Sequence, residues 1–268
     1  MVQKNIMKKI NYLYVLVIMF VVSGCAAPGK IAPEQLKQAS EQNAKLGVGY
    51  MRQGRYEVAL NKLRKSIDQD PDNADAHHYI AELYRRLGRP DDADKHFKKA
   101  LDILPDDTLS SHVAGVRNNY AVYLCEQKKY SEAKIYFGKV LEDPLYQERG
   151  QLYENMGQCE LYKGDLHQAE NYFLKALKEN PDLTNSLLAM AQLNFDQGLN
   201  TQTEIYLNKF LAKSEHDAQS LWLAILIERN KGNKADKDKI ANYSVRLKGK
   251  YPDSKQTLLL KRLESKGQ

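Results

Sequence analysis

The amino-acid sequence predicts an all-α protein, a right-handed α-solenoid of about six helix-pair repeats closed by a C-terminal capping helix. Small residues, large apolar residues and prolines recur about every 34 residues, a spacing typical of stacked helix pairs. Several independent positions keep this register from residue 40 to residue 265. No segment alternates polar and apolar residues with a period of two, so a β-sheet is not expected.

The composition fits a soluble globular chain. Of the 268 residues, 43% are hydrophobic and 28% are charged, and only 3 are Cys, which argues against a disulfide scaffold or a multi-zinc protein. The net charge is +6, but half of it comes from Lys4, Lys8 and Lys9. The rest of the chain is nearly neutral, so nucleic-acid binding through bulk charge is not expected.

Residues 1–24 are predicted to be a lipoprotein signal peptide. Three lysines precede an apolar run, Tyr12–Val22, that is too short to cross about 30 Å of hydrocarbon. The run ends in Val22–Cys25, which resembles the lipobox of bacterial lipoproteins. That resemblance implies that Cys25 is lipidated and that Ala26 favours sorting to the outer membrane. The alternative is an ordinary secretory signal with a chance Cys.

A tether is expected at residues 25–39 and the repeat domain at residues 40–268. The clearest repeat begins at Ala74, and its pattern resembles the tetratricopeptide repeat, a pair of antiparallel helices. Its signature positions are occupied by His77, Ile80, Ala81, Tyr84, Gly88, Ala93, Phe97, Ala100 and Pro105.

The other repeats follow in order with local departures. The first repeat has Ser66 where Ala is usual, and the third begins late, so that residues 107–113 lengthen the preceding loop or helix. The fourth and fifth repeats keep the register. The second helix of the sixth repeat drifts out of register, and Ser254–Leu263 forms an amphipathic stretch that can cap the array.

The residue types at these positions have a physical reason. Small residues such as Ala81 and Gly157 allow helix axes to approach within about 8–10 Å. Large side chains such as Phe97 and Phe173 fill the space that the small residues leave. Pro181 and its counterparts end the second helix of a repeat, because Pro lacks the N–H group and clashes with the preceding turn.

No catalytic or metal-binding cluster is found in the sequence. The 6 His form no i, i+4 pair, and no HExxH, GxSxG or Walker motif occurs. The paired carboxylates Asp91–Asp92 and Asp106–Asp107 fall in turns or at helix starts, where Asp caps backbone N–H groups. We therefore expect a protein that is not an enzyme and that needs no metal and no cofactor.

Cys125 and Cys159 fall on the first helices of the third and fourth repeats. Their sulfurs are expected to lie near each other, and a disulfide would persist in the periplasm. Two thiols without a nearby His pair do not make a zinc site. A disulfide and two buried free thiols are both compatible with the sequence.

Five runs in the middle of the chain carry a more specific resemblance. They are NNY at 118–120, LC at 124–125, YSEA at 130–133, DPLY at 143–146 and ENMGQC at 154–159. Together with the lipobox, they resemble the type IV pilus biogenesis lipoproteins called PilF or PilW. The resemblance covers essentially the whole chain.

The resemblance implies a non-enzymatic function in pilus biogenesis. Such proteins, called pilotins, sit on the inner leaflet of the outer membrane and face the periplasm. They bind subunits of the type IV pilus secretin and help these subunits to reach the membrane and assemble into a multimer. The alternatives are a repeat lipoprotein that scaffolds cell-wall hydrolases or assists outer-membrane protein assembly and, from another class, a peptidoglycan hydrolase.

The inner face of the first helices is the expected partner-binding groove, and it changes from charged to apolar along the chain. Exposed aromatic side chains with flanking Arg are typical anchors of protein interfaces. Leu161, Leu188 and Leu226 are expected to pack against neighbouring repeats, and the aromatic residues to be exposed. The predicted partner-binding residues are Arg85, Arg86, Asn118, Tyr162, Phe195, Trp222 and Arg229.

Overall fold

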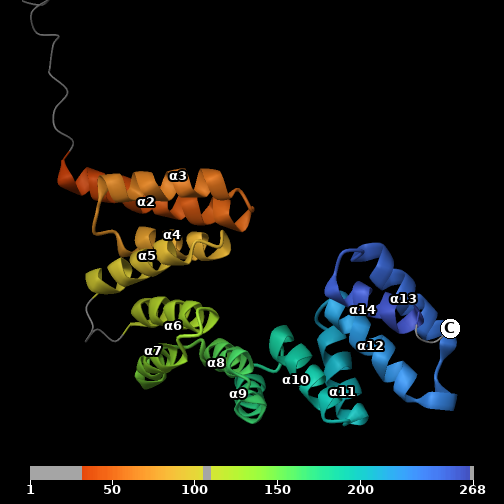
Figure 1. The fold of residues 1–268 in the computed structure, drawn as a ribbon. Coiled ribbons are helices and arrows are strands. Elements are labelled where there is room, and N and C mark those ends of the chain that lie inside the picture. The colour runs from red at the N-terminus through yellow and green to blue at the C-terminus, as the bar shows by residue number, and fades with distance from the viewer. Residues whose placement is uncertain (1–31, 105–109, 266–268) are drawn as a thin grey trace, which may run out of the picture. The chain divides into compact units, whose positions relative to one another are not determined.

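The computed structural model describes residues 32–104 and 110–265. Within these residues every regular element is a helix, which confirms the predicted all-α class and the paired-helix repeats. Figure 1 shows their arrangement. The α-helices are α2 (Pro33–Arg52), α3 (Tyr56–Gln69), α4 (Ala74–Arg86), α5 (Pro90–Ile103), α6 (Ser111–Glu126), α7 (Tyr130–Glu142), α8 (Arg149–Lys163), α9 (Leu166–Glu179), α10 (Thr184–Asp196), α11 (Asn200–Leu211), α12 (Ala218–Asn230), α13 (Lys237–Lys250) and α14 (Lys255–Ser265).

The described residues divide into two compact units, 32–79 and 80–265, with the boundary inside α4. In the first unit α2 packs against α3. A Cβ atom added to Gly47 would lie 2.6 Å from Cγ of Leu63, so only Gly permits this approach. Ser66 stands where Ala is usual because its hydroxyl lies 2.8 Å from the hydroxyl of Ser40, linking the two helices.

Helix α2 begins within residues 25–39, the segment that was predicted to be the tether. It begins at Pro33 rather than at residue 40, so the C-terminal part of the predicted tether is helical. Pro is favoured in the first turn because its φ angle already suits a helix and its missing N–H has no partner there. The signal peptide, Cys25 and Ala26 lie outside the described residues.

In the second unit the two helices of each repeat pack together, α6 with α7, α8 with α9, α10 with α11 and α12 with α13. First helices of consecutive repeats also meet, as α6 does with α8 and α10 with α12. Helices α3 and α9 end just before Pro71 and Pro181, as predicted. Pro105 lies outside the described residues, directly after the end of α5.

The turn inside each repeat contains one residue with a positive φ angle. Gly88, Gly164 and Gly198 supply it with φ angles of 68°, 89° and 77°. In the third repeat Lys128 occupies the same place with φ at 61°. A left-handed conformation costs a residue with a Cβ roughly 1–2 kcal/mol, so this turn is less stable than its counterparts.

We therefore expect Lys128→Gly to stabilise the protein by roughly 1 kcal/mol and to raise its melting temperature by about 2–4 °C. The matched control is Lys129→Gly, because Lys129 has an ordinary φ of −86° and gains nothing from Gly. Thermal unfolding of the two variants and the unchanged protein measures the effect. A melting temperature below that of the unchanged protein for Lys128→Gly would contradict the argument.

The sixth repeat drifts out of register because an additional turn follows its first helix. Residues Gly232–Lys234 form a 3₁₀ turn. The side chain of Asp236 then accepts hydrogen bonds from the N–H groups of Asp238 and Lys239 and starts α13. The predicted capping helix is present as α14, whose Leu260 is buried against α12 and α13.

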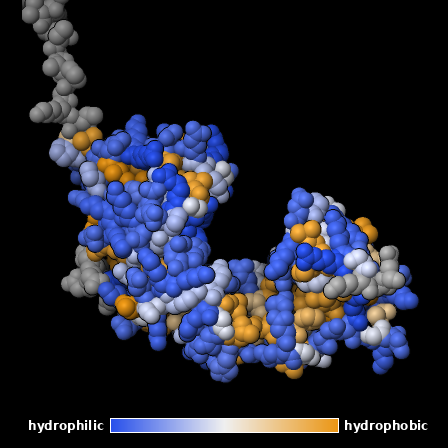
Figure 2. All heavy atoms as spheres, viewed as in Figure 1, coloured by the Kyte–Doolittle hydropathy of each residue, from blue (hydrophilic) through white to orange (hydrophobic). Residues whose placement is uncertain are grey.

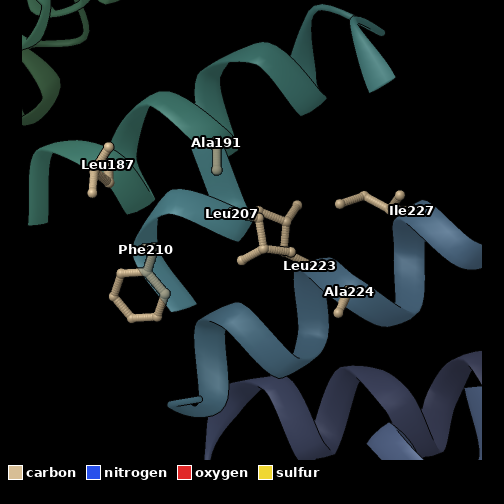
Figure 3. Close-up of a cluster of buried hydrophobic side chains, with 7 residues drawn as sticks. All are labelled: Leu187, Ala191, Leu207, Phe210, Leu223, Ala224 and Ile227. Atoms are coloured by element: carbon tan, nitrogen blue, oxygen red, sulfur yellow. The ribbon is translucent and has the colours of Figure 1, made fainter. Parts of the chain in front are cut away.

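The core between the last two repeats is built from α10, α11 and α12. Figure 3 shows Leu207 of α11 directed toward Leu223 and Ile227 of α12. This cluster places the first helices α10 and α12 side by side, and so positions the side chains of their inner face. Among the described residues, no helix is both long and apolar enough to span a membrane.

Candidate functional site

The structure places the seven predicted groove residues in three settings. Arg86, Tyr162 and Arg229 are exposed, and 51% of the surface of Tyr162 is accessible to solvent. Arg85, Phe195 and Trp222 are half-buried, and Asn118 is buried.

Arg85 is already engaged within the second unit. Its Nη1 lies 2.6 Å from Oε1 of Glu126 on α6, and its Nη2 lies 3.0 Å from Oε2 of Glu82 on α4. Two carboxylates therefore neutralise this guanidinium and link two first helices. Arg86, which is exposed, is the more accessible cation of the pair.

Asn118 is buried within the fold. Its side chain is 4% exposed, and its Oδ1 accepts a hydrogen bond of 3.2 Å from Nδ2 of Asn155 on α8. The residue lies between two first helices rather than on an open surface. Asn118, which was predicted as a partner-binding residue, is therefore already engaged in a contact between two repeats.

The Asn118–Asn155 contact is part of a junction between α6 and α8. Cys125 and Cys159 form a disulfide across the same pair of helices, with their Cα atoms 5.4 Å apart. Of the two states that the sequence left open, the structure has the bonded one. We call the disulfide and the Asn118–Asn155 hydrogen bond the α6–α8 junction.

Glu154 extends this junction to the next repeat. It is 5% exposed, and its Oε2 accepts hydrogen bonds from the backbone N–H (2.9 Å) and the hydroxyl (2.7 Å) of Ser186. Its Oε1 accepts from Nε2 of Gln151 at 2.9 Å and from Nδ2 of Asn185 at 3.0 Å. Ser186 lies in the first turn of α10, where backbone N–H groups have no partner within the helix. The carboxylate therefore caps α10 from the preceding repeat.

The run ENMGQC thus has a structural meaning. Glu154 contacts the following repeat, Asn155 contacts the preceding one, and Cys159 carries the disulfide. A Cβ on Gly157 would lie 2.8 Å from the ring of Phe173, so Gly permits α8 and α9 to meet. Glu154, Asn155 and Cys159 therefore hold three repeats together, and their side chains are already engaged within the fold.

The apolar part of the inner face lies on α8, α10 and α12. Phe195 packs against the cluster of buried side chains drawn in Figure 3, and Trp222 packs against Leu221, Ile225, Leu247 and Leu260. Both keep part of their surface in solvent. Leu161 and Leu188 pack against neighbouring repeats as predicted. Figure 2 shows hydrophobic surface over this part of the second unit.

A row of three glutamines also lies on this face, and the repeat pattern did not predict it. Gln256 of α14 donates from Nε2 to Oε1 of Gln219 on α12 at 2.6 Å, and Gln219 donates to Oε1 of Gln192 on α10 at 2.6 Å. Gln192 in turn donates to Oδ1 of Asp196 at 2.7 Å. We call Gln192, Gln219 and Gln256 the amide row.

The row was missed because its members do not share a repeat position. They are 27 and 37 residues apart, so the 34-residue period does not align them. The only local signal is an apolar residue three positions after each glutamine, namely Phe195, Trp222 and Leu259. Elsewhere in the described part of the chain, no group of three or more His, Cys, Asp or Glu side chains is placed to hold a metal ion.

Stacked helix pairs with this signature define a tetratricopeptide-repeat protein of the α-solenoid class. Family models of the tetratricopeptide repeat match residues 50–113 and 150–183. The chain belongs to the PilF family of tetratricopeptide-repeat proteins of type IV pilus biogenesis. It is 32% identical to the type IV pilus assembly protein PilF of Pseudomonas aeruginosa over 87% of this chain and 90% of that protein.

Two solved structures agree with this assignment. One, from a functional characterization of Pseudomonas aeruginosa PilF, matches with a TM-score of 0.70 and 32% identity over 85% of this chain and 98% of that one. The other is PilW, described as a widely conserved type IV pilus biogenesis factor. It matches with a TM-score of 0.70 and 28% identity over 83% of this chain and 98% of that one.

Proposed function

We propose that this protein is a non-enzymatic lipoprotein pilotin, anchored at Cys25 to the outer membrane and facing the periplasm. It binds subunits of the type IV pilus secretin and promotes their localisation and assembly into the multimer. The observation that carries the proposal is the similarity to PilF, which extends over 90% of that protein rather than over isolated repeats.

The inner face supports a protein-binding role. Tyr162 is exposed, and Phe195 and Trp222 are each only partly buried. Large aromatic side chains that are held rigidly by one side are effective anchors, because binding buries much apolar area and orders few rotatable bonds. The exposed Arg229 on α12 provides a flanking cation.

The lipid and the solenoid have separate tasks in this proposal. Acyl chains on Cys25 provide membrane affinity, and the inner face provides affinity for the secretin subunit. Joining the two in one chain raises the local concentration of captured subunits at the membrane, which favours their assembly.

Capture of secretin by the full-length protein in detergent tests the binding step, and deletion of the gene tests the assembly step. We expect co-purification of the secretin subunit and, on deletion, loss of the secretin multimer from outer-membrane extracts. Unchanged multimer, or capture of cell-wall hydrolases in place of secretin, would overturn the proposal.

Replacement of Cys25 by Ala is expected to remove the protein from the outer membrane without altering the stability of the repeats, because it deletes only the acylation site. Membrane fractionation and thermal unfolding measure the two effects. Ala26→Asp serves as the companion variant, which is expected to stay lipidated and to change membrane. The anchor at Cys25 is refuted if the Cys25→Ala protein still fractionates with the outer membrane.

A further inference from the structure

The amide row keeps hydrogen-bonding groups that the protein does not use. A glutamine side chain offers two N–H donors and an oxygen with two lone pairs. Within the row Gln219 uses one donor and one acceptor, and all three glutamines are only partly buried. The row therefore presents amide donors and acceptors in a line across α10, α12 and α14.

An apolar row runs beside it. Residues three positions apart share one face of a helix, so Phe195, Trp222 and Leu259 lie one turn beyond Gln192, Gln219 and Gln256. All three apolar residues are half-buried. The same three helices therefore present a line of amides and, next to it, a line of partly exposed apolar side chains.

This combination suits an extended polypeptide better than a helix. An extended chain leaves its N–H and C=O groups unpaired and directs alternate side chains to opposite sides. A helix satisfies its own backbone groups, so it would cover the amide row without pairing with it, and unpaired buried amides are unfavourable. No residue of the two rows is charged, and the one carboxylate bonded to them, that of Asp196, already accepts from Gln192. The rows therefore favour an uncharged ligand segment.

We infer that the amide row and the apolar row bind an extended, uncharged segment of polypeptide. The main chain of the segment hydrogen-bonds to Gln192, Gln219 and Gln256, and alternate apolar side chains contact Phe195, Trp222 and Leu259. Main-chain bonds then provide affinity and the apolar contacts provide specificity, as in strand-type peptide recognition. The inference rests on the proposed function, since we assign this segment to the secretin subunit.

Peptide binding to the unchanged full-length protein provides the first test. Overlapping synthetic peptides that cover the secretin subunit are screened by fluorescence polarisation, and the strongest binder is then resynthesised with single N-methylated backbone amides. We expect N-methylation at alternate positions to weaken binding at least tenfold, because each methyl group removes one N–H donor. A peptide that tolerates N-methylation throughout, or that binds more tightly when locked as a helix, would overturn the inference.

Variants of the amide row provide the second test. Gln219→Leu keeps the approximate volume of the side chain and removes its hydrogen bonds, and it is expected to weaken peptide binding at least tenfold. Gln256→Leu, at the end of the row, is the second variant in case Gln219→Leu fails to fold. The matched control is Gln202→Leu, because Gln202 is an exposed glutamine on α11, a second helix outside the row, and we expect less than a twofold change.

The outcomes separate this inference from the proposed function. If the unchanged protein captures no secretin subunit, both proposals are wrong. If it captures secretin, and Gln219→Leu and Gln256→Leu bind the peptide as tightly as Gln202→Leu does, the amide row is not the binding site and only the further inference is wrong.

Discussion

Replacement of Glu154 by Ala is expected to destabilise the protein by about 3 kcal/mol or more. The change removes the acceptor for four hydrogen bonds and leaves the N–H and hydroxyl of Ser186 and the amides of Gln151 and Asn185 without it. An unsatisfied buried donor costs about 1–3 kcal/mol, and the first turn of α10 also loses its cap. Urea-induced unfolding gives the change in free energy of unfolding.

Glu160→Ala is the matched control for this experiment. Glu160 lies on the same helix and pairs with Lys163 at 2.9 Å, but the lysine is half exposed. Solvent screens such a surface ion pair, so the control is expected to unfold almost as the unchanged protein does. Amide hydrogen exchange of Glu154→Ala should accelerate first in α10. Equal stabilities for the two variants would show that Glu154 does not link the repeats.

Trp222→Ala is expected to weaken secretin binding more than tenfold. Truncation of a central aromatic anchor commonly costs at least about 2 kcal/mol of binding free energy, which corresponds to more than a factor of ten in Kd. The fold is expected to persist. Trp222 is only partly buried against the core, so its truncation costs less than the 3–5 kcal/mol that is typical of a fully buried aromatic residue.

Leu223→Ala distinguishes binding from folding in this experiment. Leu223 is the next residue on α12 and is 0% exposed, so its truncation should lower the stability by about 2–5 kcal/mol while leaving the inner face unchanged. Binding and melting temperature are measured on the same samples. Trp222 is excluded from the site if Trp222→Ala binds secretin with undiminished affinity, or if it melts as early as Leu223→Ala.

The repeats could be predicted from the sequence because their determinants are local. Gly157 and Phe173 meet within one helix pair, as do Gly47 and Leu63, and each pair recurs at a fixed spacing along the chain. The end of a helix before Pro181 follows from the missing N–H group of Pro. Such signals depend on one repeat alone. The observed helix pairs confirm the repeats that these signals predict.

The lateral contacts between repeats could not be predicted in the same way. Whether Asn118 meets Asn155, or Gln192 meets Gln219, depends on how far one first helix is shifted along the next. That shift is set by core packing, such as the cluster that contains Leu207 and Leu223. It produces no repeating pattern in the sequence. For this reason the contact of Asn118 with Asn155 and the roles of Glu154 and the amide row could not be predicted.

The α6–α8 junction and Glu154 also determine where cooperativity resides in the array. In a quasi-one-dimensional protein, stability is a sum of the intrinsic terms of the repeats and of nearest-neighbour couplings, and strongly coupled repeats unfold as one block. The third, fourth and fifth repeats are coupled by a disulfide, an amide pair and a buried carboxylate. We expect this block to unfold last, and the sixth repeat and the capping helix to unfold first. On this expectation the apolar inner face on α12 and α14 lies in the part of the second unit that opens most readily, next to the part that opens last.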